Sequence, residues 1–190
     1  PTGETREWMG LPSDNRIATR VAVLDTGATF PHVLLRPDNG IPDMFSTTGE
    51  PPLDGLGHGQ WCVTAAFGQD MNTRFGRCAG VAAPRNGDII SVKCLSNIGF
   101  GTNWGVMQAM KKAWNEGAKV VNMSLGGPLQ GSVDDDPQCQ LIKRLAGEMI
   151  FCVAAGNSGP DGWTIGSPGA SPYALTVGAW STHYDGLAIF

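Results

Sequence analysis

Short apolar, β-branched runs alternate with longer helical patterns along this chain. The apolar runs cover residues 20–24, 88–94, 119–122, 148–154 and 174–177, and the helical patterns cover about 58–67, 103–114 and 137–146. Strands that are apolar throughout, with helices between them, are typical of a parallel sheet that is covered on both faces. The sequence therefore predicts an α/β fold: a twisted parallel sheet with helices on both faces.

The size and charge of the chain fit one folded domain over residues 1–190. Its 42% hydrophobic and 16% charged residues are typical of a chain with a packed core. The net charge is only -4, no run of Lys or Arg occurs, and no apolar stretch is long enough to span a bilayer. We therefore expect neither nucleic acid nor a membrane as a partner. Residues 37–55, rich in Pro, Gly, Asp and Thr, are expected to form an irregular loop.

Three short motifs supply an acid, a base and an amide. Asp25 ends the run Val-Ala-Val-Leu-Asp-Thr-Gly, His58 stands between two glycines, and Asn157 lies in Ala-Ala-Gly-Asn-Ser-Gly. A serine nucleophile needs a neutral imidazole to take its proton, a buried carboxylate to orient that imidazole, and an amide donor for the developing oxyanion. These motifs predict Asp25, His58 and Asn157 as catalytic residues. Two structural alternatives stay open: Asp25 as a turn or helix cap, and Asn157 as a left-handed turn residue.

The order of these motifs resembles that of the subtilisin-like serine proteases, the subtilase family. Three further motifs follow in family order: Gly-Val-Ala-Ala-Pro at 80–84, Ser-Val-Lys at 91–93 and Val-Asn-Met-Ser-Leu-Gly-Gly at 121–127. The resemblance covers about residues 20–190. It implies a serine endopeptidase with an Asp-His-Ser triad and an oxyanion hole, acting on peptide or protein substrates, and it favours a secreted protein.

The same resemblance implies a substrate-binding set. An extended peptide is bound as an added strand along exposed backbone, which needs small residues where two backbones approach. The segments that would flank the peptide, and the residues that would line a roomy apolar specificity pocket with Gly166 at its floor, are Gly99, Phe100, Gly101, Ser124, Leu125, Gly126, Gly127, Ala154, Ala155, Gly156 and Gly166. A plain turn at 99–101 is the alternative.

The sequence departs from the family pattern after the histidine. Most members carry Gly-Thr-His-Val-Ala-Gly there, whereas this chain has Gly-Gln-Trp-Cys-Val-Thr at 59–64, with Cys62 where proteinase K-like and kexin-like members have a cysteine. Asp70 and Asn72 lie where members often bind calcium, but two oxygen-bearing side chains are fewer than the six to eight ligands of Ca²⁺. The five cysteines form no CxxC pair and do not predict zinc. We expect no metal or cofactor, with a structural calcium ion as the open alternative.

The Gly-Thr-Ser-x-Ala motif that carries the nucleophile in this family does not occur in the sequence. The resemblance therefore implies that the chain stops before the serine, is inactive alone and needs the C-terminal remainder of the same domain. One alternative is an inactive pseudoprotease or assembly scaffold that keeps the peptide-binding fold. Another is an aspartic protease, because Asp-Thr-Gly-Ala at 25–28 resembles the retroviral-type signature; such proteins are all-β and need a second aspartate.

Overall fold

The computed structural model describes residues 19–35, 42–74, 76–82, 88–181, 183, 185–188 and 190. These residues form two compact units, Pro1–Ala118 and Lys119–Phe190, which we call unit 1 and unit 2. The start of the predicted 37–55 loop and the end of the 80–84 motif lie outside the described residues. Among the described residues, no helix is both long and apolar enough to cross a bilayer.

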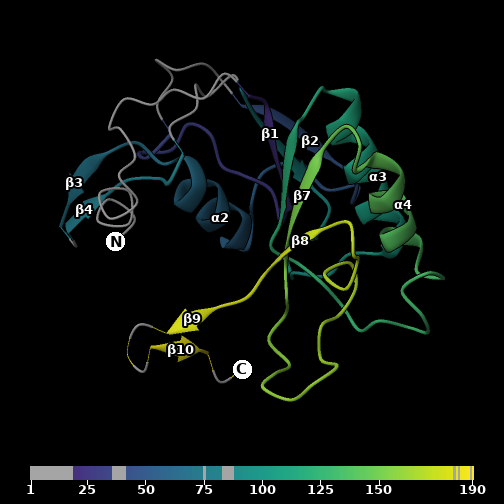
Figure 1. Ribbon diagram of the computed structural model, residues 1–190. Helices are drawn as coiled ribbons and strands as arrows, with labels where there is room; N and C mark the ends of the chain where they lie inside the picture. Colours follow the sequence, from purple (N-terminus) through teal and green to yellow (C-terminus); the bar gives the residue numbers. More distant parts are fainter. Residues whose placement is uncertain are drawn as a thin grey trace. The chain divides into compact units, whose positions relative to one another are not determined.

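Unit 1 is built on three parallel strands in the order β2 (Asp43–Ser46), β5 (Ile89–Lys93) and β1 (Val21–Asp25). Every residue of β1 and β5 is buried, which explains why these two strands read as continuous apolar runs. Two helices, α2 (His58–Phe67) and α3 (Asn103–Asn115), contact β1. They lie on opposite sides of the strands in Figure 1, so the predicted layering is present in this unit.

The local sequence explains where α3 begins and which face it buries. The Thr102 side chain accepts a hydrogen bond from the Gly105 amide and caps the helix. Val106, Ala109, Met110 and Ala113 are buried at helical spacing. This face packs on β5 and β1 and completes the core on one side of the strands.

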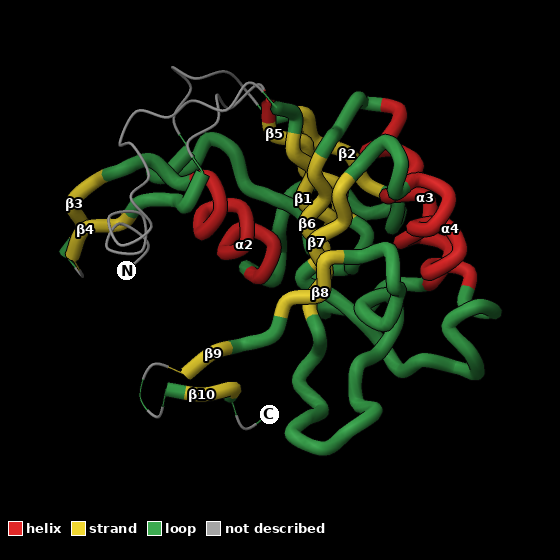
Figure 2. Tube along the Cα trace, in the orientation of Figure 1, coloured by secondary structure: helices red, strands yellow, loops and turns green. Residues whose placement is uncertain are grey.

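Unit 2 also contains three parallel strands, β6 (Val120–Met123), β7 (Ile150–Ala154) and β8 (Leu175–Val177), which are neighbours in that order. The helix α4 (Pro137–Leu145) connects β6 to β7. Asp136 caps it by accepting the Cys139 amide, and the same carboxylate accepts the Ser167 hydroxyl. A short antiparallel pair, β9 (Trp180–Ser181) and β10 (Gly186–Leu187), follows (Figure 2).

Each of the eight predicted elements is present, within one or two residues at its ends, and the α/β prediction is confirmed. The prediction of an irregular 37–55 loop is wrong in part, because β2 lies inside it. Its four residues are all half-buried, and the strand owes its existence to pairing with β5 rather than to its own propensity. Also unpredicted were β9 and β10 and an antiparallel pair, β3 (Met71–Thr73) and β4 (Gly76–Cys78).

Candidate active site

Asp25 and His58 meet in unit 1. Asp25 is the last residue of β1, His58 is the first of α2, and Asp25 Oδ1 lies 2.7 Å from His58 Nδ1, as the sequence predicted. The side chain of Asp25 is 1% exposed and that of His58 is 45% exposed. An ionised carboxylate can only accept, so Nδ1 donates, and in a neutral imidazole Nε2 is then the acceptor. This pair can therefore act as an oriented base that is accessible to a substrate.

The Asp25 carboxylate is held by its own strand end. Its Oδ1 also accepts the Thr26 amide at 2.7 Å, while the Asp25 backbone carbonyl accepts the amides of Cys94 and Leu95. Its second oxygen, Oδ2, is buried and has no hydrogen-bond partner among the described residues. A buried carboxylate oxygen without a hydrogen-bond partner costs free energy, so packing alone does not account for Asp25 Oδ2.

The start of α2 is capped by Asp54. Its Oδ1 accepts the Thr26 hydroxyl at 2.9 Å and the amides of Leu56 and Gly57 at 2.9 and 2.8 Å, and its Oδ2 accepts the Gln60 amide at 2.7 Å. Partial burial works to raise the pKa of the Asp54 carboxyl, but these donors together outweigh it and hold the pKa below its ordinary value of 3.8. The N-cap residue, Gly57, has no side chain that could accept a hydrogen bond. The Asp54 carboxylate therefore accepts the amides at the start of α2 in its place.

Thr26 ties this cap to the strand that carries Asp25. Its hydroxyl donates to Asp54 and accepts the Gly59 amide at 2.8 Å. Gly59 lies so close to Gly27 that a Cβ would overlap the Gly27 carbonyl oxygen. The first turn of α2 is thus joined to the residues directly after Asp25, and this fixes His58 relative to the carboxylate. Sequence reasoning missed this role of Asp54, although an acidic residue just before a helical pattern is a known start signal.

A second buried charge supports the same loops. Lys93, the last residue of β5, is fully buried, and its ammonium donates to the Thr26 carbonyl at 2.7 Å and to Asn97 Oδ1 at 2.8 Å. Glu50 Oε2 lies 3.2 Å from the same nitrogen, and Asn97 Oδ1 also accepts the Gly55 amide. These acceptors offset part of the free-energy cost of removing the ammonium charge from water. This role was not predicted from the sequence, because the strand pattern alone does not show which groups surround the end of β5.

The predicted peptide-binding segment of unit 1 forms a tight turn. The Ser96 amide donates to the Phe100 carbonyl and the Gly99 amide to the Ser96 carbonyl, and Gly99 has a φ of +82°. The Phe100 side chain is exposed, and Gly101 packs against the Cys94 carbonyl with no room for a Cβ. The turn that the sequence left as an alternative is therefore present, and a role of its backbone in binding peptides stays a prediction.

In unit 2 the predicted pocket residues follow β6 and end or follow β7, with Gly166 in the connection between β7 and β8. Gly127 exchanges two backbone hydrogen bonds with Ser167, at 2.8 and 2.9 Å. A Cβ at Gly166 would overlap the Gly127 carbonyl oxygen. Any side chain at 166 must therefore push this backbone pairing apart, and the place of Gly166 at the floor of a specificity pocket stays a prediction.

Asn157 lies in the exposed turn after β7. The positive φ of this turn belongs to Gly156, at +98°, and the described non-glycine residues with positive φ do not include Asn157. The left-handed alternative for Asn157 is thus not observed. Ser124 and Leu125 are half-buried directly after β6, with the Ser124 hydroxyl 3.0 Å from Asn122 Nδ2, and Ala154 and Ala155 are half-buried where β7 ends.

Comparison with known proteins decides the family. A model of the subtilase family matches residues 17–188. The chain belongs to the subtilase family. It is 34% identical over 172 residues to the serine protease AprX of Bacillus subtilis, 32% over 167 residues to subtilisin DY of Bacillus licheniformis, and 36% over 182 residues to alkaline elastase YaB of a Bacillus species. These alignments cover 84%, 84% and 94% of this chain but 37%, 56% and 42% of the relatives.

Serine peptidases are therefore the proteins that this subtilase chain is similar to, and the chain spans between 9% and 56% of the length of the relatives that it matches. Neither the family nor the parallel α/β strands support the aspartic-protease alternative, which requires an all-β fold.

The two unusual residues after His58 have structural partners in this subtilase. Gln60 Oε1 accepts the Thr29 amide at 2.6 Å, which joins α2 to the loop that follows Asp25. Trp61 is exposed, and the centroid of its ring lies 6.4 Å from that of His58 at a tilt of 42°. Trp61 is therefore an exposed neighbour of the His58 ring.

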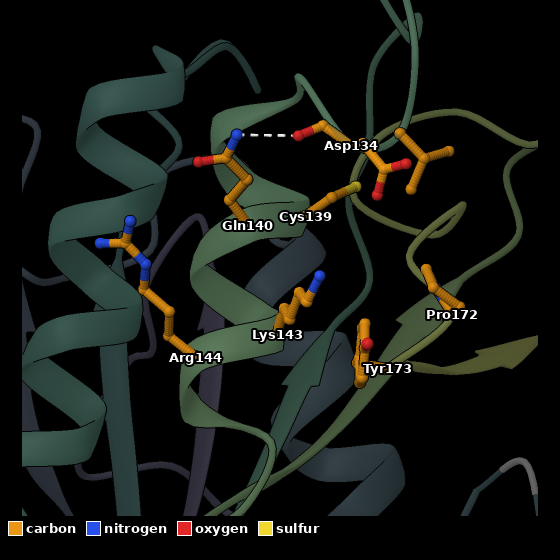
Figure 3. Close-up of a pocket in the computed structure, with 8 residues that line it drawn as sticks. Asp134, Cys139, Gln140, Lys143, Arg144, Pro172 and Tyr173 are labelled. Atoms are coloured by element: carbon orange, nitrogen blue, oxygen red, sulfur yellow. Dashed lines mark hydrogen bonds between the residues drawn. The ribbon is translucent and has the colours of Figure 1, made fainter.

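Unit 2 also contains a pocket of about 620 Å³ between α4 and residues 172–173 (Figure 3). Lys143 lies on its α4 side with the ammonium 5.6 Å from the centre of the Tyr173 ring. None of the predicted site residues lines this pocket. The candidate active site of the subtilase is therefore assigned from the Asp25 and His58 geometry and not from this cavity.

Proposed function

We propose that this chain forms part of a serine endopeptidase in which Asp25 and His58 act with a serine that lies outside residues 1–190. The observation that carries the proposal is the 2.7 Å contact between the buried Asp25 carboxylate and Nδ1 of the half-exposed His58. This contact fixes the tautomer in which Nε2 can accept a proton. Family membership supports the serine peptidase chemistry.

In this mechanism the serine hydroxyl attacks the peptide carbonyl while His58 Nε2 takes its proton. Asp25 keeps the ring oriented and stabilises the imidazolium that forms. Asn157 donates to the oxyanion of the tetrahedral intermediate. His58 then gives its proton to the leaving amine, and water releases the acyl group by the same route. The backbone at 99–101 and 124–126 would hold the extended peptide.

The position of the serine is supported by the surroundings of His58. Among the described residues, no serine hydroxyl is hydrogen-bonded to its imidazole, whose recorded side-chain partners are Asp25 and Cys62. The proposal therefore predicts that residues 1–190 cannot form an acyl-enzyme, whereas a form that includes the following part of the domain can.

Labelling with a serine-directed fluorophosphonate tests this. Residues 1–190 alone are expected to stay unmodified, and the longer form to be labelled stoichiometrically at a serine beyond residue 190. His58→Ala in the longer form should abolish labelling, because the serine loses its base. Stoichiometric labelling within residues 1–190 would refute the placement of the nucleophile. A longer form that binds peptides but resists labelling would instead indicate a pseudoprotease scaffold.

A further inference from the structure

One side chain joins the predicted peptide-binding turn of unit 1 to the loops of the candidate active site. Asn97 lies in the turn at residues 96–100, which we call the Asn97 turn. Its Oδ1 accepts two hydrogen bonds, from the ammonium of Lys93 at 2.8 Å and from the Gly55 amide at 3.1 Å. Both of these groups can only donate, so the carboxamide atom that faces them must be the oxygen. The backbone amide of Asn97 donates to Glu50 Oε2 at 3.0 Å, so the residue is held through its backbone as well.

The two donors to this oxygen lead to both members of the proposed catalytic pair. Lys93 also donates at 2.7 Å to the carbonyl of Thr26, which directly follows Asp25. Gly55 lies in the loop that leads into α2, three residues before His58. A single carboxamide oxygen therefore connects the turn to the loop after the acid and to the loop before the base.

The other contacts of the Asn97 turn do not fix its place in the same way. The Ser96 amide donates to the Phe100 carbonyl and the Gly99 amide to the Ser96 carbonyl, so these bonds set the shape of the turn and not its position. Gly99 also packs near Leu56, where a Cβ on Gly99 would lie 3.2 Å from Leu56 Cδ2. An apolar contact has no preferred direction, whereas hydrogen bonds are directional and the one from the Lys93 ammonium is strengthened by its charge.

We propose that Asn97 is a positioning residue: it holds the Asn97 turn in register with His58, so that a peptide bound along residues 99–101 presents its scissile bond to the imidazole. This inference rests on the proposed peptidase function and on peptide binding at 99–101. Binding energy from the remote residues of a substrate is used to orient the reacting group, which raises kcat. Asn97 therefore favours extended peptides, because only a substrate that is long enough to reach the turn gains from its position.

Four variants of the longer form, which includes the part of the domain after residue 190, test this role. Asn97→Leu removes the acceptor at similar volume, whereas Asn97→Asp keeps an acceptor for both donors. Gly55→Ala acts on the same hydrogen bond from the other partner, because a Cβ at Gly55 would lie 2.5 Å from Asn97 Oδ1 and must displace the carboxamide. Gly55 is not among the described glycines with positive φ, so its backbone accepts alanine. Asn115→Leu, at an exposed asparagine that ends α3, is the matched control.

The readout is how the rate depends on substrate length. We would measure kcat and KM for a blocked five-residue p-nitroanilide peptide and for a blocked single-residue ester with the same residue before the scissile bond. Asn97→Leu and Gly55→Ala should lower kcat/KM for the long substrate by about 10- to 100-fold, mainly through kcat, since a misplacement of about 1 Å costs about 10²-fold. The short substrate should change by less than about threefold, because it does not reach the turn. Asn97→Asp and Asn115→Leu should keep the native rates on both substrates.

The comparison separates positioning from a merely structural role. Equal losses on both substrates in Asn97→Leu, unchanged kinetics on both, or loss of the length dependence in Asn97→Asp would each overturn the proposal. If Asn97→Leu does not fold, Gly55→Ala decides by the same comparison. A longer form that cleaves neither substrate would refute the peptidase function instead. The affinity for a fluorescently labelled five-residue peptide, measured by anisotropy, then decides the role of Asn97: weaker binding by Asn97→Leu than by Asn97→Asp supports it, and equal binding overturns it.

Discussion

Replacing Asp54 by Asn tests whether the cap of α2 positions His58. The substitution keeps the shape of the side chain but removes the charge and turns one of the two acceptor oxygens into a donor. Either the Gln60 amide or the group of donors on Oδ1 is then left without its acceptor. A partly buried donor that loses its partner costs about 1 to 3 kcal/mol, and loss of a negative charge at a helix start about 0.3 to 1 kcal/mol. Since Asp54 is only half-buried, we expect the free energy of unfolding to fall by about 1 to 3 kcal/mol at pH 7.

The lowered pKa of Asp54 determines how its contribution to stability changes with pH. The pKa of Asp54 is lowered in the folded protein, so its carboxylate stabilises the fold at pH values above the unfolded pKa of about 3.9. That contribution is lost as the pH falls through the folded pKa. In urea unfolding, the difference in the free energy of unfolding between wild type and Asp54→Asn should therefore be largest near pH 7. This difference should shrink below about pH 4.

Kinetics of the longer form separate an effect on the position of His58 from an effect on stability alone. A misplacement of a catalytic group by about 1 Å costs about 10²-fold in rate, so kcat of Asp54→Asn should fall by about 10- to 100-fold with a smaller change in KM. The control is Asp161→Asn, an exposed carboxylate in unit 2, which should change stability by less than about 0.5 kcal/mol. Equal stability of Asp54→Asn and wild type at pH 7, or a gap that does not change with pH, would refute the reasoning.

Three further substitutions test the rest of the site. Asp25→Asn in the longer form should lower kcat by about 10⁴-fold, because the imidazole of His58 loses its tautomer control, and a loss under about tenfold would remove Asp25 from the mechanism. Asn157→Ala should lower kcat by about 10² to 10³-fold at nearly constant KM, measured by steady-state kinetics, whereas a change confined to KM would assign it to peptide binding. Lys93→Met should lower the free energy of unfolding by about 3 to 5 kcal/mol in urea, because buried acceptors lose their cation, while the exposed control Lys111→Met should stay within about 0.5 kcal/mol.

The sequence determined the elements of this protein and the family to which it belongs. Strands buried on both faces, such as β1 and β5, must be apolar at every position, so their pattern is visible without any structure. The helices can be recognised in the same way, because the residues of their buried faces are apolar and recur at helical spacing. Asp25 and His58 could be paired in advance because each stands at the boundary of a recognisable element, and the ends of parallel strands are where functional residues of α/β folds gather.

Only the tertiary structure shows which residues hold Asp25 and His58 in place and which other side chains lie beside them. β2 has no strong pattern of its own and forms because β5 offers it hydrogen-bonding groups. The hydrogen bond between Thr26 and Asp54 and the one from the buried ammonium of Lys93 to the Thr26 carbonyl join residues that are 28 and 67 positions apart. Such contacts depend on which loops the packed strands bring to one edge. The same holds for the thiol of Cys62 beside Asp25, because no local pattern encodes a distance between two separate segments.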